Sequence, residues 1–196
     1  MKFKFIYNQK LMNSVFLSLI PLIIPSNNLF DAILICISLI TVHILANISI
    51  FVIHKHVNNS TYKAPLNLVI CVAIPFLLGL IFSMIFNGYS PLIINTACFV
   101  AISEILLIAL LDVNYNNLKE NIKTCLPVPV IISIILIVIA FLRELIGLGE
   151  VLGCALPLGN LRPVGLFNQA PGGLLLLGVV VVLYSLLIKN NEEENK

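Results

Sequence analysis

Six long runs of apolar residues, separated by short polar stretches, dominate this chain of 196 residues. Hydrophobic residues make up 60% of the sequence and charged residues only 10%. Soluble domains are instead about 45–50% apolar and roughly 25% charged. A chain with so few charges cannot cover a water-facing surface, so lipid must cover much of it. The composition therefore predicts an integral membrane protein.

Most of the apolar runs have the length of a transmembrane helix, which needs about 20 apolar residues to cross the hydrocarbon core. The second to fifth runs meet this length and the sixth is near the lower limit, whereas the first is short and contains Pro21. We predict an all-α integral membrane protein with six transmembrane helices, of which the first and fourth are short or broken. The runs cover residues 11–25, 29–53, 65–86, 91–111, 126–147 and 171–188.

The first run admits a second interpretation, because Lys2, Lys4 and Lys10 precede it as basic residues precede the apolar part of a signal peptide. The residues that follow it, Ile24-Pro25-Ser26-Asn27, lack the small-residue pattern of a cleavage site. Another apolar run also begins almost at once. We therefore expect a short or broken membrane helix rather than a cleaved signal peptide.

Basic residues are divided unevenly between the two predicted sides of the membrane. With the N-terminus in the cytoplasm, the inner segments hold nine lysines, and the outer side holds only Arg162 and Arg143. Such a bias is typical of cytoplasmic segments. We predict a multi-pass protein of the cell (inner or cytoplasmic) membrane with both termini inside. The net charge of +2 gives no reason to expect a nucleic-acid partner.

Each half of the chain is predicted to cross the bilayer three times. Because three is an odd number, residues 1–86 and 91–188 would begin on opposite sides of the bilayer. If the halves are related, they form an inverted repeat, an architecture that places binding sites near the membrane midplane. We expect one membrane domain over residues 1–188, built from these two three-helix repeats. The polar residues 189–196 are expected to form a disordered cytoplasmic tail.

A few polar residues interrupt the apolar runs. Glu104 lies within the fourth run, where an ionisable group is costly and suggests a function such as ion handling. The alternative is a protonated, interior-facing glutamate bonded to a neighbouring helix. Asn95 of the same run is a second candidate for an ion path. His43 and Asn47, four residues apart on one face of the second run, are expected to make helix–helix hydrogen bonds rather than to bind metal or relay protons.

Cysteines and catalytic motifs give little support for a self-contained enzyme or metal site. The five cysteines are spread almost one per run, without a CxxC pair or a Cys/His cluster. This spacing argues against a disulfide framework and a zinc site, and most of the thiols are expected to be small buried side chains. The sequence also contains no recognisable nucleophile–base pair, nucleotide-binding loop or haem motif.

Several strings resemble membrane subunits of the Rnf/Nqr family, and in particular its RnfE/NqrD type. Residues 141–149, FLRELIGLG, resemble the family element L-R-E-[IL]-[IL]-G-x-G, and residues 170–174, APGGL, resemble the opening of its last helix. Residues 17–22 and 91–104 resemble two further family strings. The resemblance extends over nearly the whole chain. It assigns structural motif positions to Pro21, Arg143, Glu144, Gly147, Gly149, Pro171 and Gly172. From its place near a helix end alone, Arg143 is expected to extend to the lipid headgroups.

The resemblance implies a subunit of an ion-translocating electron-transport complex, which couples redox between ferredoxin or NADH and an acceptor to Na⁺ or H⁺ movement. It implies other membrane subunits as partners, especially a paralogue of inverted topology. In the family, each of these two chains gives two cysteines to an intramembrane [2Fe–2S] cluster, which needs four thiolates. Here the two cysteine positions hold Ile20 and Ala97, and Cys98 follows one residue later. We therefore expect a scaffold and ion path with a missing or altered cluster site, for which Cys98 is the candidate ligand.

Two other functions stay open. Six short spans also suit a small-solute transporter or a substrate-capture membrane subunit. A structural membrane partner without a ligand of its own is the third possibility. The joint pattern of residues 143–149 and 171–173 favours the Rnf/Nqr-type subunit over both.

Overall fold

The structure is a computed structural model that describes residues 9–57, 60–85, 90–110, 125–151, 154–155 and 164–194. Within these residues the fold is almost entirely helical, as predicted. A short antiparallel hairpin, β1 (Glu150–Val151) with β2 (Cys154–Ala155), and the 3₁₀ helix η2 (Gly165–Asn168) follow α6. The α-helices are α1 (Gln9–Ile23), α2 (Leu29–His56), α3 (Ser60–Ile85), α4 (Ser90–Leu110), α6 (Pro127–Gly147) and α7 (Ala170–Glu194).

Three helices in the described part of the chain are long and apolar enough to cross a membrane. They are Leu29–His56, Tyr62–Met84 and Pro127–Gly147, which correspond to the second, third and fifth apolar runs. The other helices contribute the shorter apolar stretches Met12–Ile23, Asn95–Leu110 and Ala170–Leu186. The helical fold is therefore confirmed, and its apolar helices support a place in a membrane.

Two helices differ from the sequence-based expectation. The fourth helix was expected to be short or broken, but α4 runs without interruption from Ser90 to Leu110. Pro91 does not break it, because a proline in the first turn removes an N–H that has no partner inside the helix. Likewise, α7 continues to Glu194, so most of the stretch expected as a disordered tail is helical. Lysine and glutamate in this stretch are good helix formers, and neither Pro nor Gly interrupts it.

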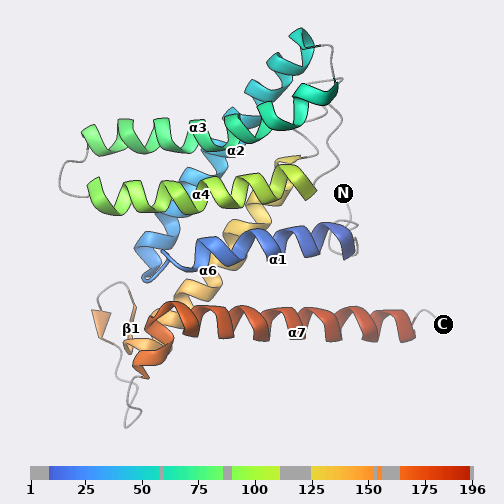
Figure 1. Cartoon of the computed structure of the whole chain (residues 1–196). Coiled ribbons are helices and arrows are strands. Elements are labelled where there is room, and N and C mark those ends of the chain that lie inside the picture. Colours follow the sequence, from blue (N-terminus) through green and yellow to red (C-terminus); the bar gives the residue numbers. More distant parts are fainter. Residues whose placement is uncertain are drawn as a thin grey trace.

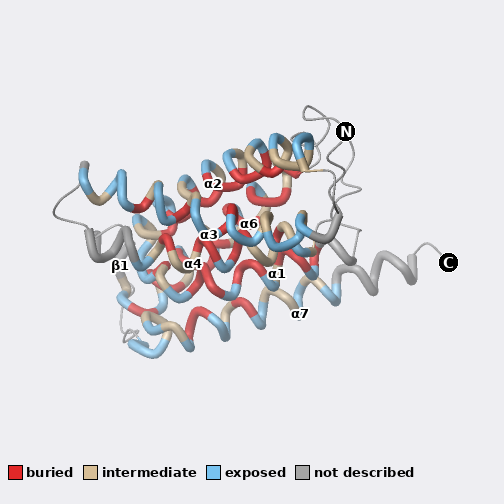
Figure 2. The backbone as a smooth tube through the Cα atoms, turned by 45° about the horizontal axis from the view of Figure 1, so that its top comes forward, coloured by how far each residue is buried: buried red, intermediate tan, exposed pale blue. Residues whose placement is uncertain are grey.

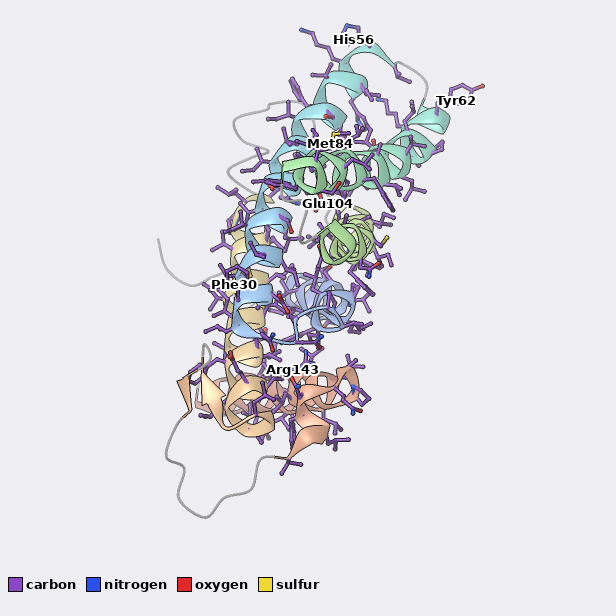
Figure 3. The ribbon with its side chains drawn as sticks, turned by 90° about the vertical axis from the view of Figure 1, so that its left-hand side faces the viewer. Phe30, His56, Tyr62, Met84, Glu104 and Arg143 are labelled. Carbon is purple, nitrogen blue, oxygen red and sulfur yellow. The ribbon has the colours of Figure 1, made fainter. Side chains whose placement is uncertain are left out.

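Four helices lie side by side in a row, in the order α3, α4, α1 and α7, and α2 and α6 cross one face of the row (Figure 1). The row is seen nearly end-on in Figure 3. Within it, α4 contacts α3 and α1, and α1 contacts α4 and α7. Of the crossing helices, α2 packs against α3, α4 and α6, and α6 packs against α1, α2 and α7. The start of α1 and the end of α7 lie at the same end of the row.

The core lies between the row and the two crossing helices, where buried residues concentrate (Figure 2). One large cluster joins α1, α2, α4, α6 and α7, and includes Leu19, Leu39 and Leu136. A smaller cluster joins Ala46 and Ile50 of α2 to Ile70 and Cys71 of α3. The outer helices α3 and α7 expose many large apolar side chains, as expected of surfaces that face lipid or a partner rather than water.

Candidate functional site

A buried histidine and a buried glutamate face each other across α2 and α4. Nδ1 of His43 lies 2.9 Å from Oε1 and 3.2 Å from Oε2 of Glu104. Their side chains are only 2% and 0% exposed. The oxygens of an ionised Glu104 can only accept hydrogen bonds, and in that state the Nδ1–H of His43 donates to them. The predicted helix–helix hydrogen bond of His43 is therefore confirmed, and Glu104 is its partner.

Three further polar side chains surround this pair. Nδ2 of Asn47 donates to the carbonyl oxygen of His43 at 2.8 Å, within α2. Cys125, just before α6, interacts with the imidazole of His43, and Cys71 of α3 lies close enough to Glu104 for an electrostatic interaction. We call these five residues the His43–Glu104 cluster. They come from α2, α3, α4 and the start of α6.

Two atoms of this cluster stay without a hydrogen-bond partner in the described part of the protein. They are Nε2 of His43 and Oδ1 of Asn47, and both are buried. The great majority of buried polar atoms in proteins are hydrogen-bonded, so an exception indicates a bound water, an ion or a functional group. The two atoms belong to residues one helical turn apart on the buried face of α2.

The sequence places these side chains inside the protein through helical periodicity. The buried stripe of α2 recurs every three or four residues and includes His43, Ala46 and Asn47. On α4, Glu104 lies on the stripe of buried residues that includes Val100, Ser103 and Leu107. The hydroxyl of Ser103 donates to the carbonyl oxygen of Ser18 at 2.9 Å, which joins α4 to α1 beside Glu104. This contact helps to fix the rotation of α4.

The two residues predicted for an ion path are not brought together. Glu104 belongs to the cluster, whereas the side chain of Asn95 is exposed near the start of α4. Sequence reasoning named Glu104 and His43 separately and missed their pairing. The available signal was that both are ionisable residues inside apolar runs, and such residues commonly pair with each other.

A second polar site surrounds Arg143, the largest fully buried side chain described. Its Nη1 donates to the carbonyl oxygens of Ile23 and Ser26, at 2.8 and 2.7 Å. Its Nε and Nη2 donate to the carbonyl oxygens of Phe167 and Asn168, and Nη2 also donates to Oδ1 of Asn27. We call Arg143 with these five acceptors the Arg143 node. The expectation that Arg143 extends to the headgroups is wrong, because carbonyl oxygens at the ends of α1 and η2 already satisfy it.

Other residues of the family-like strings lie around this node. Oε2 of Glu144 accepts a hydrogen bond from the backbone N–H of Leu29 at 3.1 Å, at the positive end of the α2 dipole. A Cβ added to Gly147 would lie 2.8 Å from the backbone nitrogen of Asn168. Gly149 has φ 70°, a conformation that favours glycine. Gly149 and the β1–β2 hairpin end the helical path after α6.

The start of α7 packs closely on η2 and on the Arg143 node. A Cβ added to Gly172 would collide with backbone atoms of Leu166 and Phe167. A Cβ added to Gly173 would lie 2.5 Å from Cγ2 of Ile23 and 3.1 Å from Cζ of Arg143.

Pro171 occupies the first turn of α7, where proline is well tolerated. Pro21 lies in the last turn of α1, which leads into the node.

The residues present do not fit an iron–sulfur cluster. At the two positions where the family resemblance places cysteines, Ile20 is 41% exposed and Ala97 is buried. Cys98 is a free thiol of intermediate exposure. Across the described ranges, no group of three or more His, Cys, Asp or Glu side chains is placed to hold a metal ion. Four thiolates, two from each chain, would be needed. We therefore assign no electron-transfer step to this chain.

No protein-family model matches the chain, and a comparison with curated proteins finds no relative. By its fold and its two polar sites, the chain is a helical protein with candidate membrane spans and a buried ionisable pair.

Proposed function

We propose that this chain is a non-catalytic membrane subunit of an ion-translocating electron-transport complex of the Rnf/Nqr type, which acts as scaffold and ion path and lacks an intact [2Fe–2S] site. The observation that carries the proposal is the buried pair of His43 and Glu104 between two helices. Burying an ionisable pair among apolar helices is costly, and such pairs mark ion pathways in membrane proteins.

The packing of the helices supports two inverted repeats, α1–α2–α3 and α4–α6–α7. If the repeats are equivalent, α1 corresponds to α4, α2 to α6 and α3 to α7, and each contact should have an equivalent contact. The α3–α4 contact then corresponds to α7–α1, α2–α3 to α6–α7, and α1–α6 to α4–α2. All of these contacts occur. The two members of each exchanged pair run in opposite directions (Figure 1). These relations support six spans with both termini on the same side.

The position of the pair also supports an ion path. His43 belongs to the first proposed repeat and Glu104 to the second, so their hydrogen bond crosses the interface between the repeats. Transporters built from inverted repeats bind their ions at this interface. Two repeats that move relative to each other would therefore change the environment of the pair directly.

The Arg143 node supports the family resemblance. The two family-like strings at residues 141–149 and 170–174 are separated in the sequence, yet both contribute to one packed site. Residues that follow the string at 17–22 also join it, because Ile23 and Ser26 accept hydrogen bonds from Arg143. Two separate strings that meet in one site, beside the residues that follow a third, are better explained by a shared fold than by chance similarity of apolar sequences.

A small cavity between α2, α3 and α4 suits water or a small ion better than an organic solute. Its volume is about 40 Å³, and Ser38, Thr41 and Thr96 contribute hydroxyl-bearing side chains to its wall. This is space for water rather than for an organic solute, since small-molecule sites typically measure about 300–1,000 Å³. A solute transporter is therefore the alternative against which the experiment is designed.

The experiment is affinity purification of the tagged chain from its native membrane, followed by reconstitution of the recovered complex into liposomes. We expect flavin-containing and iron–sulfur-containing subunits to co-purify and to drive ion flux when reduced. Glu104→Gln should leave the complex assembled but reduce redox-driven flux about tenfold or more, because a neutral amide cannot replace the carboxylate as a charge carrier.

Glu144→Gln is the matched control. This variant also neutralises a buried glutamate, but it keeps an oxygen that can accept the hydrogen bond from Leu29. Flux in this variant should remain near the level of the unmodified complex. Purification without any redox subunit, or full flux in Glu104→Gln, would refute the proposed function. Binding of a vitamin or other small solute by the isolated chain would favour the alternative.

A further inference from the structure

We infer that the ion carried by this chain is a proton, bound at Nε2 of His43, with the carboxylate of Glu104 as its fixed charge partner. This inference rests on the proposed ion path and specifies its chemistry. It starts from the two nitrogens of the imidazole, which have different surroundings. Nδ1 is held by both oxygens of Glu104, whereas Nε2 is buried and makes no direct hydrogen bond of ordinary geometry among the described residues. The thiol of Cys125 lies beside the imidazole.

The protonation step follows from this geometry. With Nδ1–H donating to Glu104, the neutral imidazole presents its lone pair at Nε2. A proton that arrives there forms an Nε2–H bond and converts the imidazole into an imidazolium, while the carboxylate stays ionised. The net charge of the pair then changes from −1 to 0. In a site that excludes water, a neutral ion pair is less costly than an isolated carboxylate, so uptake of one cation is favoured.

Oδ1 of Asn47 provides the second unpartnered atom at this site. It lies on the same buried face of α2, one turn beyond His43. Nδ2 of Asn47 is bonded to the carbonyl oxygen of His43, so the amide is oriented and Oδ1 acts only as an acceptor. An acceptor near the imidazole can stabilise the new Nε2–H, directly or through a water molecule.

The same groups are poorly suited to Na⁺. Hard cations prefer a shell of oxygen ligands, whereas nitrogen and sulfur ligands suit transition metals. Both oxygens of Glu104 face Nδ1 of His43, which leaves Oδ1 of Asn47 as the remaining side-chain oxygen of the cluster. The other groups are an imidazole nitrogen and two thiols. Nor do the cluster residues form a ligand set for a metal ion within the described chain.

Few other titratable groups face the pair. Cys71 approaches it from α3 and Cys125 from the start of α6. On the α1 side, Ser103 beside Glu104 is bonded to the backbone of Ser18, and neither serine titrates. Arg143 lies well apart from Glu104, near α7 (Figure 3). Among the described residues at this site, histidine is the residue type that commonly changes charge near neutral pH, and His43 is the histidine present.

The test is a pH titration of the full chain, labelled with ¹⁵N-histidine and purified into lipid nanodiscs. His43→Gln identifies the His43 signals by their loss, and His54→Gln on the same helix serves as the control that should retain them. We expect the Nε2 signal of His43 in the unmodified chain to move from the unprotonated to the protonated position as pH falls. Replacing K⁺ by Na⁺ at constant ionic strength should not change this titration.

Glu104→Gln gives a second measurement on the same signal. Removing the carboxylate should move the titration midpoint of His43 to lower pH by about one unit or more, because an opposite charge nearby favours the protonated form. A His43 signal that does not change with pH, or one that Na⁺ shifts and K⁺ does not, would overturn the inference. Both results are measured on the unmodified chain, and His43→Gln and His54→Gln serve only to assign the signal.

This outcome can be separated from failure of the proposed function. The titration uses the isolated chain and needs no redox subunit. If His43 titrates but the chain never co-purifies with redox subunits, the proton site is supported and the proposed complex is refuted. If the complex is redox-driven but Na⁺ shifts the His43 signal, the complex is supported and the proton as its ion is refuted.

Discussion

Arg143→Ala is expected to lower the free energy of unfolding by at least about 3 kcal/mol, and it is the substitution with the largest expected effect on stability. Truncation removes five hydrogen bonds at once. It leaves the buried carbonyl oxygen of Ser26 without this donor, whereas that of Ile23 keeps the hydrogen bond from the hydroxyl of Ser26. Each unsatisfied buried acceptor costs about 1–3 kcal/mol. The measurement is chemical unfolding of the purified chain in detergent micelles, followed by circular dichroism.

Two further variants show whether the geometry or the charge of Arg143 matters. Arg143→Lys keeps the positive charge but cannot present a planar fork to α1 and η2 together, so we expect an intermediate loss. Ile134→Ala changes a side chain of α6 that is 59% exposed and should alter stability by no more than about 0.5 kcal/mol. If Arg143→Ala were as stable as Ile134→Ala, the node would have no role in holding the helices together.

Gly172→Ala is the second substitution for which we expect a large effect. The added Cβ would collide with backbone atoms of Leu166 and Phe167, which cannot rotate away as a flexible side chain would. Moving Phe167 would also disturb its carbonyl oxygen, which accepts a hydrogen bond from Arg143. We expect a loss of about 1–3 kcal/mol, the usual cost of overpacking, measured as a lower thermal unfolding midpoint.

Gly178→Ala provides a matched control in the same helix. A Cβ added to Gly178 meets no atom within 4 Å, so it creates no collision. Alanine favours helix over glycine by about 1 kcal/mol, and this variant should therefore be as stable as the unmodified chain or more stable. The two substitutions are thus expected to act in opposite directions. A fall in the unfolding midpoint of similar size in both would contradict the packing of α7 on η2.

The lengths of the apolar runs predicted the positions of the helices well, but they did not predict the continuity of α4 or the hairpin after α6. The predicted start of α2 at Leu29 and the predicted end of α6 at Gly147 agree with the structure. The fourth helix is continuous although Pro91 lies near its start, because a proline in the first turn is compatible with a continuous helix. The β1–β2 hairpin was not predicted, because strands of two residues are too short to show alternation.

The candidate site was predictable residue by residue but not as a site. Glu104 and His43 were each conspicuous because a polar group inside an apolar run needs a partner. Their pairing depends on how α2 and α4 rotate and cross, which neither segment specifies alone. For Arg143, nearness to the helix end suggested the membrane surface. The acceptors that bury it come from α1 and η2, which lie far from it in the sequence.

The long reach of Arg143 has a consequence for how the protein is made. Ile23 and Arg143 are separated by 120 positions, and the acceptors in η2 follow Arg143 by about two dozen more. As the chain leaves the ribosome, α1 is therefore synthesised long before the side chain that secures its end. The carbonyl oxygens of Ile23 and Ser26 therefore lack their hydrogen bonds from Arg143 until most of the protein has been translated. The end of α1 thus acquires its final hydrogen bonds only after α6 has been made.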